Sequence, residues 1–347
     1  MSAPRAGQGS RGGVSRGTDP APRAAAGRRP ARRVLSAVLQ VAIVAAVVWF
    51  AARTLGGQWT AFRERALTVR PRWTGVLGSA ALVFATYALL IESWRALVRA
   101  WGDRLGYVDA ARIWAVSNLG RYVPGKVWSI GAMGVLAQRA GVSPVAATGS
   151  AVLGTLVNLA AGFVVLFLAG HEVVATLFPG AARFAGLLPL LGGAGLFAVP
   201  VLLPLAARLA AGFSGRPYTP VWLPARTLLG VSAANVCSWV LYGVAFRWLA
   251  GALLPDLAGK WGEYVAVFAG SYLAGYLALV IPGGLGVREL SMTAALVRLG
   301  AATAPDAALL AVASRLWLTV LELAPGLVFL ARGALRSASR SRSDVSV

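Results

Sequence analysis

The chain has 347 residues, of which 58% are hydrophobic and only 13% are charged, and its mean hydropathy is +0.69. An ordinary soluble domain carries about 25% charged residues, so the composition excludes a soluble protein and predicts an all-α integral membrane protein. The formal net charge of +21 does not indicate nucleic-acid binding, because the positive charge concentrates in the tails and in short segments between apolar runs, as in membrane proteins.

Cysteine and histidine each occur once, as Cys237 and His171. A single cysteine excludes an intrachain disulfide, and together they supply no cluster of zinc ligands. We therefore expect no metal and no other cofactor.

The N-terminal residues 1–33 are rich in Gly, Ala, Pro and Arg and predict a disordered cytoplasmic tail. The apolar run at 34–52 follows. It could be the core of a signal peptide, even a twin-arginine one, but such cores have about 7 to 15 residues. The greater length of this run favours a retained first transmembrane helix, which opens a domain over residues 34–331.

Six further apolar runs have the length of about 20 residues that a membrane crossing needs; they are 73–91, 145–169, 183–206, 226–250, 261–281 and 307–331. Both ends of the chain are rich in arginine, including the basic tail at 332–347, so both termini are expected in the cytoplasm and the number of crossings is expected to be even. The segment 107–125 is the best candidate for an eighth crossing. We therefore expect a multi-pass protein of the plasma membrane with about eight helices.

Two segments resemble each other. "YVDAARIWAVSNLGRYVPGKVW" starts at Tyr107 and "YVAVFAGSYLAGYLALVIPGGLG" at Tyr264, and both carry Tyr-Val, Ser-x-Leu-x-x-Tyr and Pro-Gly. Such duplication is typical of secondary transporters, whose sites form at the repeat interface from interrupted helices. The alternative is chance similarity between Leu-, Ala- and Gly-rich segments. We expect repeat halves at roughly 34–180 and 181–331.

Each copy contains helix breakers, Pro124 and Gly125 in the first and Pro282, Gly283 and Gly284 in the second. Backbone groups left unsatisfied in hydrocarbon cost several kcal/mol each, so such a break must be packed in protein or face water or a ligand. We expect two interrupted or re-entrant elements.

The helix that restarts after the second break has a free N-terminus, where an anion such as a lipid phosphate is favoured. Arg288 adds a forked donor, and Glu289 could pair with it or bind a cationic headgroup. The alternative is an interfacial loop with an exposed ion pair.

Other polar residues lie within or beside the apolar runs. Arg315 and Glu322 are seven residues apart and share a helix face. They could neutralise each other or line a path for a lipid headgroup. Asn118, Arg121 and Lys126 flank the first Pro-Gly.

Three polar residues have simpler interpretations. Glu92 and Arg95 fit a pair at the membrane surface. Asn158 fits a single hydrogen bond between packed helices.

The strings "LGRYVPGKVWSIGAMGVLAQRAGVSPVAA", "IPGGLGVRE" and "SRLWLTVLELAPG" resemble the flippase-like transmembrane region of lysylphosphatidylglycerol synthases and its stand-alone bacterial relatives. The resemblance covers roughly residues 34–331. It implies translocation of phospholipids between leaflets, with Arg288, Glu289 and Arg315 as motif residues. The full synthases continue into an aminoacyl-transferase domain, so we expect no lysyl transfer by this chain.

The sequence fits two classes of membrane enzyme less well than it fits a transporter. Gly212 to Gly215 resembles a rhomboid protease nucleophile motif, but the one histidine precedes the serine. A polyprenyl-diphosphate phosphatase would need a serine or paired glutamates near the arginine, and only Ser291 is close. A non-transporting envelope scaffold is a further alternative. We expect a non-enzymatic lipid translocase whose partners are membrane lipids, with a homo-oligomer or a separate lipid-modifying enzyme as further partners.

Overall fold

The structure is a computed structural model that describes residues 59–122, 127–177, 223–278 and 286–343, with isolated positions 180, 187, 190, 193, 194 and 284 between them. Apart from a short 3-10 turn, η1 (Leu119–Tyr122), the main elements of this part of the chain are α-helices. They are α2 (Trp59–Thr68), α3 (Trp73–Ala100), α4 (Tyr107–Asn118), α5 (Val127–Arg139), α6 (Pro144–Leu177), α8 (Ala225–Leu253), α9 (Trp261–Leu277), α10 (Val287–Arg298) and α11 (Ala304–Ser343).

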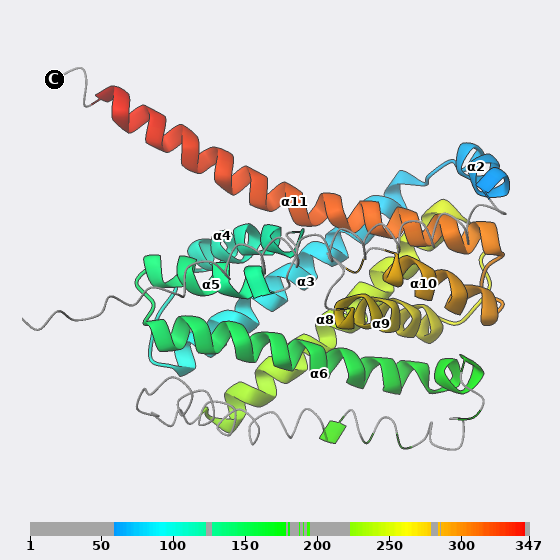
Figure 1. Ribbon diagram of the computed structural model, residues 1–347, viewed down its shortest axis with the longest axis horizontal. Coiled ribbons are helices and arrows are strands. Elements are labelled where there is room, and N and C mark those ends of the chain that lie inside the picture. The colour runs from blue at the N-terminus through cyan, green and yellow to red at the C-terminus, as the bar shows by residue number, and fades with distance from the viewer. Residues whose placement is uncertain are drawn as a thin grey trace, which may run out of the picture.

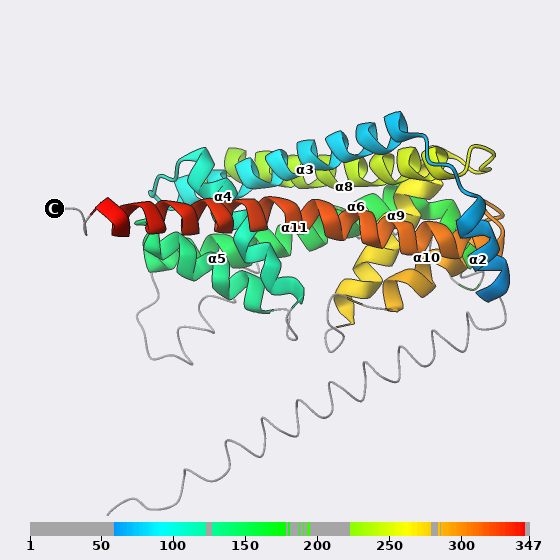
Figure 2. The same ribbon diagram turned by 90° about the horizontal axis from the view of Figure 1, so that it is seen from above.

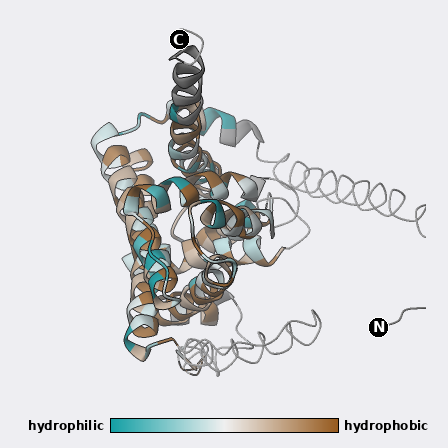
Figure 3. Ribbon diagram, turned by 90° about the vertical axis from the view of Figure 1, so that its left-hand side faces the viewer, coloured by the Kyte–Doolittle hydropathy of each residue, from teal (hydrophilic) through white to brown (hydrophobic). Residues whose placement is uncertain are grey.

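Four of these helices are long and apolar enough to cross a membrane: Trp73–Ala100, Pro144–Gly170, Ala225–Leu253 and Ala304–Arg332. They contain the apolar runs expected at 73–91, 145–169, 226–250 and 307–331, which confirms an all-α membrane protein. Figure 3, coloured by hydropathy, shows brown, apolar residues over much of the helical bundle. The N-terminal tail, the run at 34–52 and most of the run at 183–206 lie outside the described residues.

The two remaining expected crossings form shorter helices. At 1.5 Å per residue, the 12 residues of α4 span about 18 Å, whereas the hydrocarbon core is about 30 Å thick. Helix α9 has 17 residues and ends at Leu277, ahead of Pro282. The described part of the chain thus contains four spanning helices and two pairs of short helices, rather than the six full crossings expected there.

The described helices follow one order twice: a long helix, two short helices and a long helix. Helices α3, α4, α5 and α6 form the first set and α8, α9, α10 and α11 the second. The two leading helices α3 and α8 pack on each other, α6 packs on α9, and α11 packs on α4. Figures 1 and 2 show the pair α4 and α5 at one end of the molecule and the pair α9 and α10 at the other. Each set therefore lays its last long helix on a short helix of the other.

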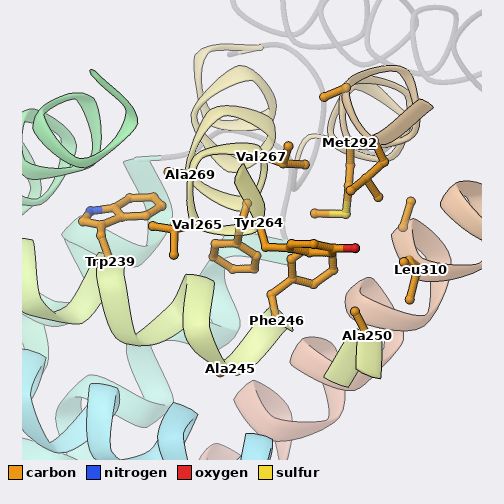
Figure 4. Close-up of a cluster of buried hydrophobic side chains, with 14 of the residues drawn as sticks. Trp239, Ala245, Phe246, Ala250, Tyr264, Val265, Val267, Ala269, Met292 and Leu310 are labelled. Carbon is orange, nitrogen blue, oxygen red and sulfur yellow. The ribbon is translucent and has the colours of Figure 1, made fainter. Parts of the chain in front are cut away.

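The largest buried cluster joins the second set of helices. Phe246 on α8, Tyr264 on α9, Met292 on α10 and Leu310 on α11 each have 2% or less of their surface exposed. Figure 4 shows these side chains meeting in one cluster. The cluster holds α9 and α10 rigidly between α8 and α11, and so fixes the chain on both sides of the second break.

The second break is packed backbone against backbone. Gly284 has φ +65°, and a Cβ atom at this position would lie 2.5 Å from the carbonyl oxygen of Gly275 on α9. A left-handed conformation and the absence of a side chain are both needed here. This contact explains why the break carries a glycine at 284 and why α9 carries one at 275.

Replacing Gly284 by alanine is expected to lower the free energy of unfolding by about 2 to 5 kcal/mol, because left-handed strain and overpacking add. Gly300 is a matched control, since it also has φ +65° but nothing lies within 4 Å of its would-be Cβ. Gly300→Ala should cost only the strain, about 1 to 2 kcal/mol. Thermal unfolding in detergent measures both, and equal losses would contradict the packing at the break.

Candidate functional site

Arg288 lies at the start of α10 and is buried, with 5% of its surface exposed. Its guanidinium lies over two aromatic rings of α9, 5.2 Å from the centroid of Phe268 and 4.9 Å from that of Tyr272. Gly275 makes room for it, because a Cβ there would lie 3.1 Å from the Cβ of Arg288. The fold thus places a cation between α9 and α10 directly after the break.

Two donors of this guanidinium are unused. Nε and Nη2 of Arg288 are buried and have no hydrogen-bond partner among the residues that the structure describes. The aromatic faces offset part of the cost of burying the charge, but a buried donor without an acceptor costs about 1 to 3 kcal/mol, and more when it is charged. A buried polar group without a partner calls for a specific explanation, such as a bound water or ion.

The carboxylate of Glu289 is held by two other groups, the backbone of Gly286 and the side chain of Arg315. Its Oε2 accepts a hydrogen bond of 2.7 Å from the backbone N–H of Gly286, which caps the N-terminus of α10. Its Oε1 lies 3.7 Å from Nε of Arg315 on α11, and both side chains are mostly buried. The carboxylate of Glu289 therefore occupies part of the helix N-terminus that the sequence suggested for a lipid phosphate.

Arg315 and Glu322 of α11 complete a charged cluster around α10. Arg315 pairs with Glu289, so its partner comes from another helix and not only from its own. Glu322 is buried, and the charges of Arg315, Glu322 and Glu289 all act on Arg288. Four charged side chains predicted from the sequence are thus brought together where α10 meets α11.

The residues around the first break are only partly described. Asn118 ends α4 and is buried, with 7% of its surface exposed. Pro124, Gly125, Lys126, Pro282 and Gly283 lie outside the described residues, as does the side chain of Arg121.

A polar cavity of about 160 Å³ lies between helices of both sets. Asn118 and Tyr272 both line it, and the guanidinium of Arg288 lies over the ring of Tyr272. The other lining side chains come from α3, α4, α5, α6, α8 and α9 and include serines, asparagines, tyrosines and tryptophans. The cavity and Arg288 therefore share the wall formed by Tyr272.

A chain of amides joins three long helices beside this cavity. Asn158 on α6 donates to Oδ1 of Asn235 on α8 at 2.9 Å, and Nδ2 of Asn235 donates to Oγ of Ser93 on α3 at 2.9 Å. Asn158 thus makes the hydrogen bond between helices that the sequence suggested. The sequence analysis did not predict Asn235 or Ser93 as partners of Asn158. The position of Asn235 inside the apolar run at 226–250 could have indicated a hydrogen bond between helices.

Replacing Asn235 by alanine is expected to cost about 1 to 2 kcal/mol of stability, because it breaks two bonds between helices of the kind measured in membrane proteins. Ser238→Ala is the control, since within the described residues the Ser238 hydroxyl bonds to the carbonyl of Asn235 in its own helix and to no other helix. Thermal unfolding in detergent reports both values. A loss for Asn235→Ala no larger than for Ser238→Ala would show that the amide chain does not tie the helices together.

The pair at the end of α3 agrees with its simple interpretation. Glu92 accepts hydrogen bonds from both Arg95 and Arg99, and its side chain is 44% exposed. It forms a local ion-pair cluster at the rim of the bundle and contributes little to stability.

The fold and this cluster define a polytopic α-helical membrane protein with buried charge beside a polar cavity. The sequence profile described as "Lysylphosphatidylglycerol synthase TM region" matches residues 37–326, so the chain belongs to that family. The family ties the protein to the handling of membrane lipids. No protein of curated function matches the chain.

Proposed function

We propose that the protein moves amphiphilic lipids with an anionic headgroup between the two leaflets of the cell membrane. The observation that carries this proposal is Arg288, a buried arginine with two unused donors. Phosphate suits it, because a guanidinium can donate two parallel hydrogen bonds to two oxygens of the same group.

The surroundings of Arg288 support a mobile guest rather than a fixed counter-ion. Glu289, the nearest carboxylate in sequence, is engaged by the N-terminus of α10 and by Arg315. The Tyr272 ring connects Arg288 to the polar cavity between the two sets of helices. A headgroup could thus be held by charge at Arg288 and by neutral groups in the cavity while its chains remain in lipid.

The repeated order of helices supports the same proposal. We interpret the two sets as an internal repeat, and the pairs α4–α5 and α9–α10 as interrupted elements that enter the membrane without crossing it. Sites of secondary transporters form where such elements meet. The sequence contains no P-loop motif, so we propose that movement is passive, ion-coupled or driven by a partner, with both termini in the cytoplasm.

Reconstitution into vesicles tests the function. Vesicles containing the protein should expose fluorescent phosphatidylglycerol from the inner leaflet to an impermeant quencher, and a labelled lipid without phosphate should exchange much more slowly. Exchange of phosphatidylglycerol at the rate of protein-free vesicles would contradict the proposal. Release of phosphate from a polyprenyl diphosphate by the same preparation would instead favour the phosphatase alternative.

A further inference from the structure

The polar cavity has a chemistry different from that of the charged cluster. Its lining includes the hydroxyls of Thr155 and Tyr276, the amides of Asn118 and Asn158, and the aromatic rings of Trp94, Trp114 and Trp239. No Asp, Glu, Lys or Arg belongs to the set of described residues that line it. The cavity therefore offers neutral hydrogen-bonding groups and flat apolar faces.

We propose that this cavity is a second subsite that takes a neutral, ring-shaped polyol of the lipid headgroup, such as an inositol or a hexose. The inference rests on the proposed function, and it adds the class of substrate. Amides and hydroxyls both donate to and accept from sugar hydroxyls, while aromatic faces pack on the C–H face of the ring. A cationic aminoacyl headgroup would need a carboxylate for its charge, and the described lining supplies none.

The size of the cavity fits one ring. An enclosed cavity of about 150 Å³ binds benzene, and this cavity has about 160 Å³ and is partly open, which leaves room for the hydroxyls of a polyol ring. Tyr272 contacts the guanidinium of Arg288 and also lines the cavity, so a phosphate at Arg288 and a ring in the cavity would both lie next to this residue. A headgroup that carries a phosphate and a ring could therefore occupy both places.

The test compares two phosphodiester lipids with the same acyl chains and the same charge, phosphatidylinositol and phosphatidylmethanol, which differ by the ring. Native mass spectrometry of the full chain in detergent, with equal amounts of both lipids, gives the ratio of bound phosphatidylinositol to bound phosphatidylmethanol. We expect a ratio of about ten, which corresponds to one or two added hydrogen bonds. A ratio near one for the unaltered protein would overturn the subsite.

The combined variant Thr155→Val and Tyr276→Phe removes two hydroxyls from the cavity and keeps the size of both side chains. We expect the ratio to fall to near one while retention of phosphatidylmethanol is unchanged. Thr86→Val is the matched control: the Thr86 hydroxyl bonds to the carbonyl of Leu82 as that of Thr155 bonds to Ala151, but Thr86 does not line the cavity. A ratio unchanged in the combined variant, or lowered equally by the control, would also overturn it.

Two further measurements distinguish the ring subsite from the phosphate site at Arg288 and from a site for a soluble polyol. Arg288→Met should lower retention of both lipids alike, so its effect reports on the phosphate site and the ratio reports on the ring. Free myo-inositol should compete for the cavity only at concentrations far above those of the lipid. Competition by inositol at the concentration of the lipid would assign the cavity to a soluble polyol and overturn the lipid subsite.

Discussion

Arg288→Met is expected to slow leaflet exchange of phosphatidylglycerol by about ten- to a hundredfold, the equivalent of the 1.5 to 3 kcal/mol that a hydrogen bond to a charged group contributes. The same change should leave thermal stability unchanged or raise it. The reason is that two donors of the buried guanidinium have no partner in the described part of the chain, and replacing a poorly satisfied buried charge by an apolar side chain of similar length is often neutral or stabilising. Exchange in vesicles and thermal unfolding in detergent give the two values.

Arg247 on α8 supplies a matched control for Arg288. Its guanidinium also lies over two aromatic rings, 5.5 Å from the centroid of Trp261 and 4.8 Å from that of Tyr264, but the residue is only partly buried. Its Nε is also buried without a hydrogen-bond partner among the described residues, but Arg247 does not belong to the charged cluster around α10. Arg247→Met should therefore change exchange by less than about threefold. If Arg288→Met lowered stability and left exchange unchanged, the arginine would have a structural role.

The second large effect concerns the ion pair between Glu289 and Arg315. A double-mutant cycle with Glu289→Gln and Arg315→Gln should give a coupling energy of about 1 to 3 kcal/mol, because both side chains are less than 20% exposed and one partner also caps α10. Glutamine keeps the cap, since its side-chain oxygen still accepts from Gly286. The cycle therefore isolates the charge interaction from the cap.

The pair of Asp109 and Arg112 on α4 serves as a reference for this cycle. Both side chains are more than half exposed, and the two atoms lie 3.1 Å apart. Its coupling energy should be about 0.5 kcal/mol or less. Equal coupling in the two pairs would mean that Glu289 and Arg315 meet in a solvated environment, contrary to the fold.

Much of the site was predictable because the sequence carries both the break and the charges. Proline and glycine inside an apolar run predict a local departure from the helix, and the structure shows Gly284 in a left-handed conformation against Gly275. Charges within apolar runs are costly enough to point to buried partners. Arg288, Glu289, Arg315 and Glu322 were found in this way.

The partners of those charges were not predictable, because a single sequence shows which residues share a helix face but not which face another helix covers. Glu289 could have paired with Arg288 beside it, yet the turn at Gly286 directs its carboxylate to the helix N-terminus and to Arg315. In the sequence, nothing distinguishes Phe268 and Tyr272 from ordinary core residues of an apolar helix. The crossings expected at 107–125 and 261–281 are longer than the helices α4 and α9 that the structure shows there. The reason is related: apolar composition predicts the length of a run, but the helix can stop before the run ends.

The central claim is that Arg288 binds the phosphate of a membrane lipid. An experimental structure of the protein in a bilayer of phosphatidylglycerol tests it most directly. The account predicts a lipid phosphate at Arg288, with oxygens about 2.7 to 2.9 Å from Nε and Nη2, the length of charge-assisted hydrogen bonds. A structure in which both nitrogens donate to carbonyl or carboxylate oxygens of the protein, with no lipid at the guanidinium, would contradict it.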